Sequence, residues 1–380
     1  MTAPESALHR TPLFDWHAAH GGRIVEFGGW EMPVQYSGIV EEHHAVRRCA
    51  GLFDISHMGR LAFSGLDAEP FLNQLLTCRV DNLSEGQIRY GLVCRDDGGV
   101  LDDILVYKLD PLNFGLVVNA SNRSKIVTWI EKHADLVAPA NHERDLEFTD
   151  QTTGSAMIAI QGPKSLGILS QVVTSDIPLG SLRYYSGCNG DIAGVECYIS
   201  RTGYTGEDGF EIIVTEGKTQ GPKVWELILA TGSSDGLIPC GLGCRDTLRL
   251  EAAMPLYGHE LNEETDPLTA GLSFAVKLDK DSFIGREALI RIKAQPKRVV
   301  RVGLKLASRR IAREHAEVYV GDQRVGEVSS GTFSPTLEQS IAMGYVAPEA
   351  ASVGSTVQVD IRGKRESATV VPLPFYKRVE

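Results

Sequence analysis

The chain has 380 residues, a hydrophobic content of 43% and a charged content of 23%. These values are typical of a soluble globular protein, and the length exceeds one ordinary core, so we expect two or three domains. The formal net charge of −11 argues against a nucleic-acid backbone as the main partner.

The amino-terminal segment and the cysteines predict a cytoplasmic protein. MTAPESALHRTPLFDW has neither the basic start and apolar core of a secretory signal nor the Arg- and Ser-rich character of a transit peptide. No run of about 18 apolar residues is present, so no membrane span is expected. Cys240 and Cys244 have no companion His or Cys cluster, which argues against a zinc site, and the seven cysteines are expected to be scattered, reduced thiols.

The first part of the chain alternates helix and strand patterns. The expected elements before residue 120 are a helix running into a strand over 41–56, a strand, a turn and a helix over 60–76, and strands at 89–94, 102–109 and 113–119. Residues 121–134 predict a helix in which Ile126, Trp129 and Ile130 share a face and Ser121 caps the start.

From about residue 146 the alternation of strand and helix patterns starts again, and after about residue 285 it gives way to short strand patterns alone. Before the change we expect strands at 147–153, 156–163 and 186–190, a helix over 164–173, a hairpin over 196–214, and helices over 222–232 and 243–254. After it, short strands are expected within 298–306, 316–331, 340–346, 356–363 and 366–376. Strands at such spacing are typical of a small sandwich or barrel, so an α+β body in two lobes with an all-β tail is predicted.

Residues 201–212, RTGYTGEDGFEI, combine glycines and acids in one short segment. A phosphate-binding loop needs a Lys and a hydroxyl residue after its last glycine, but Phe210 and Glu211 follow here. A dinucleotide fingerprint needs a helix at that point, and a calcium loop needs alternating carboxylates closed by a distant Glu. The segment is therefore predicted to be a hairpin with an elaborated turn, in which glycines permit positive φ angles.

The second strand of this hairpin carries an acid among aliphatic residues. Alternation places Phe210, Ile212 and Val214 on one face, and Glu211 and Ile213 on the other. An acid beside Ile213 lies either at a solvated edge or in a cavity, and the pattern leaves both open.

Residues 91–109 hold two pairs of aspartates around a glycine turn. Asp96 and Asp97 suit the turn, because Asp side chains bond nearby backbone amides. Asp102 and Asp103 instead open an apolar strand, where neighbours point to opposite faces, so one is expected to face out and the other in. An inward carboxylate is costly unless it is paired or used, and alternation does not decide which of the two it is.

Two further features are open to a functional and a structural interpretation. Tyr90 and Tyr107 bracket the same hairpin, and they either wall a pocket for a flat ligand or pack in the interior. In the predicted helix within 240–261, Arg245 and Arg249 form either a solvated, salt-bridged face or a guanidinium site for a ligand carbonyl or carboxylate.

Taken together, these segments resemble one family, the T-protein of the glycine cleavage system, which is a folate-dependent aminomethyltransferase. The matching motifs run in order from about residue 11 to about residue 375: TPLFDWHAAHGGRIVEFGGWEMPVQY, GLFDISHMG, GGVLDDILVY, AIQGP, RTGYTGEDGFEI, GLGCRDTLRLEAAMPLYGHEL and SSGTFSPTLEQSIAMGYV. Two departures are the CRDD turn, where relatives often carry an Asn-containing turn, and Cys244 in place of a common Ala.

The resemblance implies an α+β fold of three lobes around a central folate-binding opening. Two α/β lobes with antiparallel sheets are joined by a C-terminal all-β barrel. The folate-binding lobe is expected to be discontinuous, at 1–54 and 146–280. An inserted lobe at 55–145 carries the DD hairpin, and the barrel domain is expected at 281–380.

The same resemblance implies tetrahydrofolate as co-substrate, with no metal and no flavin, and a lipoyl carrier protein (H-protein) as partner. The reaction moves the one-carbon unit of an aminomethyl group from the lipoyl arm to tetrahydrofolate, releases ammonia and gives 5,10-methylenetetrahydrofolate. An acidic carrier would favour a positive rim around the pocket, which the net charge of −11 does not support. No nucleic acid and no membrane is implied.

The family's functional residues are carried over to this sequence by position. Its catalytic aspartate falls on Asp103, which would orient the folate amine and stabilise positive charge on the one-carbon unit, with a role as base left open. Its pterin-binding glutamate falls on Glu211, because one carboxylate accepts the ring N–H and the exocyclic amine together. The other folate-site positions are Arg245, Tyr204, Tyr90, Met58, Tyr107 and, as a weaker match, Tyr376.

Three kinds of related protein are alternatives. Folate-dependent demethylases of small methylated compounds share the outline, but the DD pair and GYTGEDG favour aminomethyl transfer. Sarcosine and dimethylglycine oxidases need a flavin domain for which 380 residues leave no space. Non-enzymatic folate-binding scaffolds depend on a KGCYxGQE motif, and Gly203 stands here where its cysteine would be.

Overall fold

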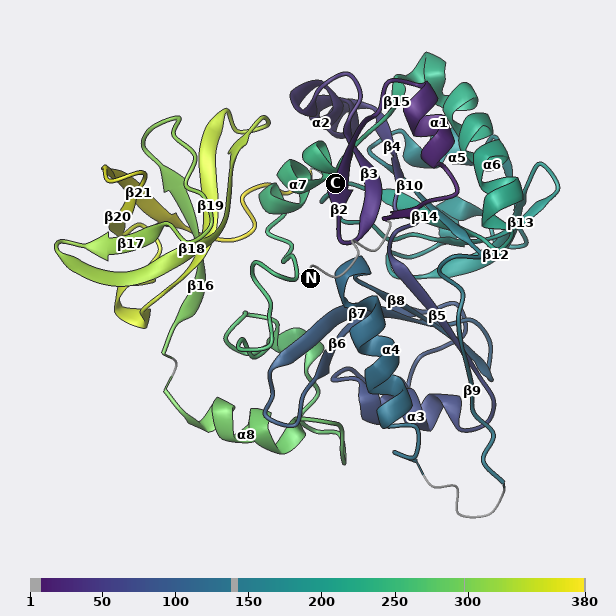
Figure 1. Cartoon of the computed structure of the whole chain (residues 1–380), viewed down its shortest axis with the longest axis horizontal. Helices are drawn as coiled ribbons and strands as arrows, with labels where there is room; N and C mark the ends of the chain where they lie inside the picture. Colours follow the sequence, from purple (N-terminus) through teal and green to yellow (C-terminus); the bar gives the residue numbers. More distant parts are fainter. Residues whose placement is uncertain (1–7, 138–142, 297, 379–380) are drawn as a thin grey trace, which may run out of the picture.

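The computed structural model describes residues 8–137, 143–296 and 298–378. Three groups of strands and helices surround the centre of the molecule, with a C-terminal barrel on one side and two mixed groups on the other (Figure 1). This architecture confirms the predicted α+β fold with a terminal barrel. Within the described residues, every helix is too short or too polar to span a lipid bilayer.

The first group is built on a seven-stranded sheet. Its strands are, in spatial order, β11 (Val173–Thr174), β12 (Gly187–Ile192), β13 (Val195–Ser200), β14 (Gly209–Val214), β10 (Ala156–Gln161), β4 (Ala50–Asp54) and β15 (Leu237–Pro239). All neighbours are antiparallel except β4 and β15. β4 comes from the start of the chain and pairs with β10, so this sheet joins two distant parts of the sequence.

The two faces of this sheet are covered by different helices. The helices of this group are α1 (Phe14–Ala19), α2 (Ile39–Arg48), α5 (Ser165–Leu169), α6 (Gly217–Gly232) and α7 (Leu242–Glu251). Phe210 and Ile212 pack with Trp225 of α6 in one core, whereas Met157 of β10 packs with Leu248 of α7 on the other side. The alternation predicted along β14 is confirmed, because Glu211 lies on the face opposite Phe210 and Ile212.

The second group is built on a five-stranded antiparallel sheet. Its strands, in spatial order, are β6 (Ile88–Cys94), β7 (Val100–Lys108), β8 (Asn113–Val118), β5 (Gly59–Ser64) and β9 (Glu147–Asp150). α3 (Ala68–Leu75) and α4 (Arg123–Lys132) cover it, with Phe71 and Ile126 in the shared core. The domain boundary predicted at residue 145 stays a prediction. The five-stranded sheet continues past that residue, because β9 pairs with β5.

A small sheet and a closed barrel complete the fold. The small sheet has the order β1 (His9–Arg10), β3 (Trp30–Gln35) and β2 (Arg23–Phe27). The barrel closes in the order β16 (Val300–Leu306), β19 (Gln339–Val346), β18 (Gln323–Ser334), β17 (Glu317–Val320), β20 (Thr356–Asp360) and β21 (Arg365–Val371). The remaining short helices are η1 (Ala120–Asn122), η2 (Leu179–Ser181), η3 (Ser233–Asp235), η4 (Ser273–Ala275) and η5 (Pro348–Ala350).

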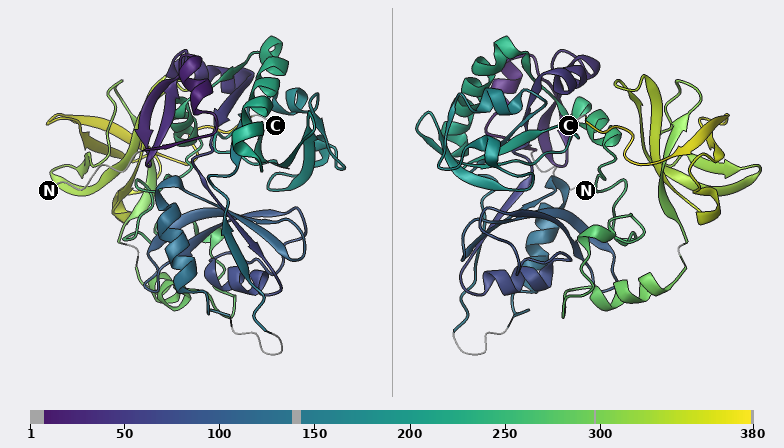
Figure 2. Two further views of the ribbon diagram at one scale, coloured as in Figure 1. Left: turned by 45° about the vertical axis from the view of Figure 1, so that its right-hand side comes forward. Right: turned by 180° about the vertical axis from the view of Figure 1, so that it is seen from behind.

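Helix α8 (Arg286–Ala294) belongs to the five-stranded sheet and not to the barrel. Figure 2 shows it beneath that sheet, before the chain turns up into the barrel. Leu289 is fully buried in a core with Leu92 and Cys94 of β6. The predicted boundary at residue 280 therefore separates α8 from the sheet it packs against, and the barrel strands begin only at Val300.

Two local predictions were wrong. The helix expected over 164–173 ends at Leu169, because Val173 leaves it to pair with Ile192 as part of β11. Ser121 does not cap the helix expected over 121–134, since it lies inside η1 and α4 begins after Asn122 without a side-chain cap.

The position of α8 gives a stability prediction. Leu289→Ala removes a fully buried side chain from the core shared with β6, so it should lower the free energy of unfolding by roughly 2–5 kcal/mol. Glu287→Ala, on the exposed side of the same helix, should change it by about 0.5 kcal/mol or less. Urea denaturation of both variants checks this, and equal effects would contradict the packing.

Candidate functional site

A cavity of about 880 Å³ lies where the three groups of secondary structure meet. Asp103 of β7, Glu211 of β14, Arg245 of α7 and Arg301 of β16 all line it, so each group contributes to its wall. The lining also includes Met58, Tyr90 and Tyr204. Six of the eight residues proposed from the sequence are thereby brought together in one place.

Glu211 lies in this cavity wall, which decides between the two positions left open by the sequence pattern. The strand register pairs it with Ser200 and Ala159, so β13 and β10 flank it and its side chain is only 6% exposed. Burial raises the pKa of the carboxyl, while a hydrogen bond of 2.6 Å from the Thr202 hydroxyl to Oε2 and the charge of Arg245 oppose the rise. Among the described residues nothing bonds Oε1, which is therefore available to a ligand.

Arg245 and Arg249 are one turn apart on α7 and both line the cavity, but only one has partners. Arg249 is 2% exposed and donates to Asp246, Glu260 and Ser330 at 2.8–2.9 Å. The Nη1 of Arg245 is buried and has no hydrogen-bond partner in the described part of the chain. The solvated, salt-bridged face is therefore excluded for these arginines, and Arg245 presents unused donors.

Tyr204 forms the surface beneath Arg245. The guanidinium carbon lies 4.7 Å from the ring centroid, within the range of a cation–π contact. The Tyr204 hydroxyl donates to the carbonyl of Pro255 at 2.5 Å, which fixes the ring between the β13–β14 turn and the segment after α7.

Asp102 and Asp103 lie on opposite faces of β7, but neither carboxylate points into bulk solvent. Asp102 is fully buried and accepts N–H groups from the Asn119 backbone at 3.0 Å, the Asn119 amide at 2.8 Å and the Asn122 amide at 2.6 Å. The expectation that one of the pair faces outward is wrong, because η1 and α4 cover that side of the strand. Asp103 is the member that lines the cavity.

The two carboxyl groups interact, and a proton shared between them resides mainly on one of the two. Burial raises the pKa of both, and the charge of Asp103 raises that of Asp102 further. Asn119 donates to both carboxylates. Asp103 also accepts the Tyr90 hydroxyl at 3.1 Å, and this hydrogen bond, together with that from Asn119, lowers the pKa of Asp103 against the effect of burial. A proton shared by the pair therefore resides on Asp102, which is fully buried and whose pKa the charge of Asp103 raises, and Asp103 is the member that ionises first.

Aromatic residues form the wall around Asp103. Tyr90 stacks with Phe274, with ring centroids 5.8 Å apart. Phe274 is 63% exposed and comes from η4, after the strongly patterned segments, so sequence reasoning did not select it. Stacked rings at a cavity opening suit a flat, partly apolar ligand.

Two of the predicted site residues lie outside the cavity lining. Tyr107 is on the same face of β7 as Asp103, but by that point the strand runs beneath the seven-stranded sheet, and its side chain packs with Phe53 in the core. Tyr376 stacks on the guanidinium of Arg47 at 4.0 Å and donates its backbone N–H to Glu251. The cavity wall does not include either ring.

His57 lines the cavity and was missed by sequence reasoning. It is 2% exposed, its Nδ1 is buried, and neither ring nitrogen bonds another described residue. Burial lowers its pKa to about 3, with a further lowering from Arg245 against the charge of Asp54, so the ring is neutral at physiological pH. A single histidine in an apolar stretch gives no periodic signal that would mark it.

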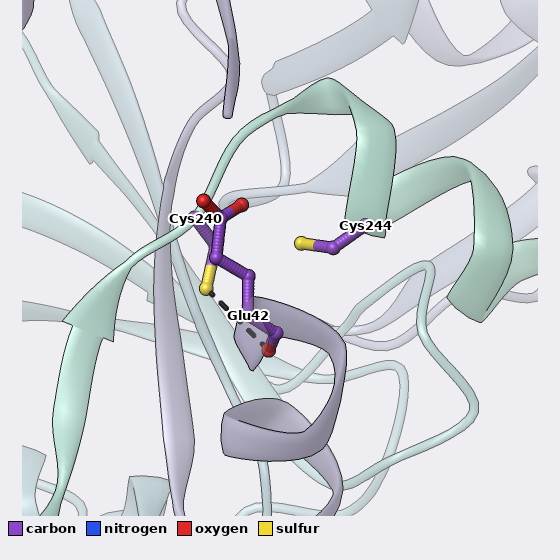
Figure 3. A group of neighbouring side chains, drawn as sticks. All are labelled: Glu42, Cys240 and Cys244. Atoms are coloured by element: carbon purple, nitrogen blue, oxygen red, sulfur yellow. Dashed lines mark hydrogen bonds between the residues drawn. The ribbon is translucent and has the colours of Figure 1, made fainter. Parts of the chain in front are cut away.

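Glu42, Cys240 and Cys244 meet behind the cavity, with possible ligand atoms within 4.8 Å of one another (Figure 3). The Glu42 carboxylate already accepts N–H groups from Tyr36, Gly38 and Gly241. Burial raises the pKa of the Cys244 thiol well above its usual value, which keeps it protonated. Within the described residues the group has three members, one short of a closed zinc site, and its carboxylate serves to hold the start of α7.

Comparisons with known proteins agree along the whole chain. Residues 13–280 match the family described as GCVT N-terminal domain, and residues 299–377 match the Glycine cleavage T-protein C-terminal barrel domain. An aminomethyltransferase of Desulfitobacterium hafniense is 47% identical over 373 residues, covering 98% of this chain and 99% of that protein. One of Geobacillus thermodenitrificans is 45% identical over 377 residues, covering 98% and 100%. The crystal structure of glycine cleavage system aminomethyltransferase T from Bartonella henselae superposes with a TM-score of 0.87 at 33% identity, covering 97% and 98%.

The contrast between the two arginines of α7 predicts opposite effects on stability. Arg249→Met leaves Glu260 buried without its cation and should lower the free energy of unfolding by about 3–5 kcal/mol. Arg245→Met removes a buried donor that lacks a partner, so it should raise the free energy of unfolding by about 1 kcal/mol. Urea denaturation of the two variants checks this, and a large loss for Arg245→Met would mean that its role is structural.

Proposed function

The chain belongs to the glycine cleavage T-protein family and is an aminomethyltransferase, and from this premise we propose the following reaction. The protein takes the one-carbon unit from an aminomethyl group on a lipoyl carrier protein and transfers it to tetrahydrofolate. The carbon–sulfur bond and the carbon–nitrogen bond of the aminomethyl group break, and two bonds form from the carbon to N5 and N10 of the folate. The two N–H protons leave with sulfur and nitrogen, which gives a lipoyl thiol, ammonia and 5,10-methylenetetrahydrofolate.

The observation that carries this proposal is a set of unused polar atoms in one aromatic-walled cavity. Glu211 offers a free carboxylate oxygen, and Arg245 offers a buried donor without a partner. A pterin presents a ring N–H and an exocyclic amine side by side, which a carboxylate accepts together, and it carries a ring oxygen that accepts from a guanidinium. Tyr204 and Tyr90 supply flat faces at the same cavity. Leaving polar atoms unsatisfied in a buried place is costly, which favours a ligand that pairs with them.

Asp103 is proposed as the residue that acts on the reacting atoms. It is the member of the aspartate pair that lines the cavity, and it is held by Tyr90 and Asn119. As the folate amine attacks, positive charge develops on the one-carbon unit, and a fixed carboxylate stabilises it. The raised pKa also suits Asp103 to exchange a proton near neutral pH, which an ordinary aspartate does poorly. Its partner Asp102 lies on the other face of the strand and keeps the shared proton, because the charge of Asp103 raises the pKa of Asp102.

A basic groove on the barrel supports an acidic carrier as the partner, which the net charge of −11 does not. The lining of the groove includes four arginines, Arg309, Arg310, Arg313 and Arg362, against two acids, Glu314 and Asp360. It shares the segment 313–315 with the central cavity, so the two openings are neighbours. An acidic domain near these arginines would bring its flexible arm close to the site of transfer.

The decisive experiment measures ammonia and methylenetetrahydrofolate formed from an aminomethylated lipoyl carrier. Asp103→Asn should reduce turnover by about a hundredfold or more, while tetrahydrofolate still binds, because the variant keeps the shape of the site and loses the charge. Binding is followed separately by fluorescence titration.

Three other outcomes are informative. Folate-dependent methyl transfer from a sulfonium or methoxy donor, with none from the carrier, would assign the protein to the demethylases. Folate binding without turnover on either donor would indicate a binding scaffold. Full activity in Asp103→Asn would contradict the role given to that residue.

The hydrogen bond from Tyr90 to Asp103 predicts a shift in the pH profile. If ionised Asp103 is required, kcat/KM rises as the pH rises through its elevated pKa. Tyr90→Phe removes the hydroxyl whose hydrogen bond lowers the pKa of Asp103, so the acid limb of the profile should move to higher pH by about one unit. Asp96→Asn, an exposed change on the same hairpin, should leave the profile in place. A shift of the alkaline limb instead would mean that Asp103 acts in its protonated form.

A further inference from the structure

Arg47, on α2, is a buried arginine that does not line the cavity but contacts the turn beside it. Its side chain is 5% exposed. Nη1 donates to the carbonyl of Thr205 and to Oε1 of Glu207, both at 2.8 Å. These two residues belong to the β13–β14 turn, directly after Tyr204.

On its other side, Arg47 is held by groups that are themselves fixed. Nη2 donates to Oε2 of Glu251 at 2.8 Å, and Glu251 accepts the hydroxyl of Ser334 in the barrel at 2.5 Å. Although burial alone would raise it, the pKa of Glu251 is lowered to about 2 by His43, Arg47 and Ser334, so this carboxylate stays ionised. The anchor of Arg47 therefore joins α7 to the barrel.

The turn is also held by Gln161, which bonds Thr202 and Thr205, and by the ion pair of Arg201 with Asp208. Arg47, however, is the side chain that ties the turn to Glu251 of α7. Gly206 has a φ of +81° and its position for a Cβ lies 2.9 Å from Ala252, so the turn passes very close to the end of α7. Tyr376 stacks on Arg47 at 4.0 Å from the C-terminal tail and covers the ion pair. The acids of the turn thus face away from the cavity, whereas Tyr204 faces into it.

We propose that Arg47 is a positioning residue for the folate site. Through Thr205 and Glu207 it holds the β13–β14 turn so that the Tyr204 ring and the start of β14, which carries Glu211, keep their places in the cavity wall. Tyr376 stacks on Arg47 on the side away from the cavity, and it does not contact the ligand. The inference rests on the proposed function, because tetrahydrofolate is the ligand that the positioned wall receives.

The hydrogen bonds of Arg47 make its positioning role distinguishable from a general contribution to stability. The guanidinium is a planar fork that reaches the turn with one nitrogen and Glu251 with the other two, which a single ammonium cannot reproduce. Without it, the turn keeps its backbone path but loses its register against α7. A shift of about 1 Å in a binding wall is enough to weaken binding by one to two orders of magnitude.

The test compares Arg47→Met with a matched buried cation elsewhere. Lys280 is also buried, and its Nζ donates to the carbonyls of Asn73, Leu76 and Cys78, away from the cavity lining. Both Arg47→Met and Lys280→Met should lower the Tm. Only Arg47→Met should raise the dissociation constant of tetrahydrofolate, by about tenfold or more, and only it should speed amide exchange across residues 203–208.

Two further variants keep the test decisive. Arg47→Lys retains the charge and should recover part of the Tm but not the folate affinity. If Arg47→Met does not fold, Glu207→Ala removes one of the two contacts to the turn, leaves that to the Thr205 carbonyl, and should reproduce the loss of affinity in milder form.

The outcomes distinguish this inference from the proposed function. Wild-type protein that fails to bind tetrahydrofolate would overturn the proposed function, while amide exchange would still report on the turn. Wild-type protein that binds, with unchanged affinity in both Arg47→Met and Glu207→Ala, would overturn the positioning role. An equal loss of affinity in Lys280→Met would show that the effect is one of stability alone.

Discussion

The structure depends on keeping a few charges out of water at the junction between α7 and the barrel. Glu251 has no contact with solvent, and it is satisfied jointly by Arg47 and His43 of α2 and by Ser334 and Thr336 from the barrel side. A second buried pair, Arg249 with Glu260, repeats the arrangement beside the cavity. Removing one partner from such a network leaves an uncompensated charge, so the barrel and the sheet groups are energetically coupled, and the cavity between them keeps a defined shape.

In contrast to this well-paired junction, several buried polar groups without a partner among the described residues line the cavity, while others, such as those of Trp129 and Trp225, lie elsewhere. The contrast is sharpest within α7, where Arg249 has four partners and Arg245, one turn earlier, has a nitrogen without a hydrogen-bond partner among the described residues. Glu211 keeps one free oxygen and His57 has no bonded nitrogen among the described residues. Burying polar groups without partners costs free energy that the rest of the fold has to offset. Where charged and titratable groups of this kind line one cavity, the cost is a physical mark of a binding site.

The sequence was informative where a short-range repeat of apolar residues determines which face of an element a side chain lies on. Alternation along β14 placed Glu211 correctly, and the spacing of short strands indicated the barrel. The sequence patterns failed where a contact with a segment far away in the sequence determines the position of a side chain. Tyr107 shares the face of Asp103, but another sheet covers it, and Tyr376 is drawn to Arg47 by a contact that no local pattern encodes. The roles of individual residues came from family resemblance, and the structure tests their placement and not their chemistry.

The pairing of β4 with β10 and β15 has a consequence for how the chain is made. β4 is synthesised before the whole five-stranded group, yet its neighbours in the sheet come only after that group. During translation β4 therefore stays apolar and unpaired while the five-stranded group is synthesised and forms its own core. Long-range pairing of this kind slows folding and leaves a sheet edge open to wrong partners. The lobe that contains Glu211 thus begins first and is completed late, which makes it the part of the molecule most in need of protection during translation.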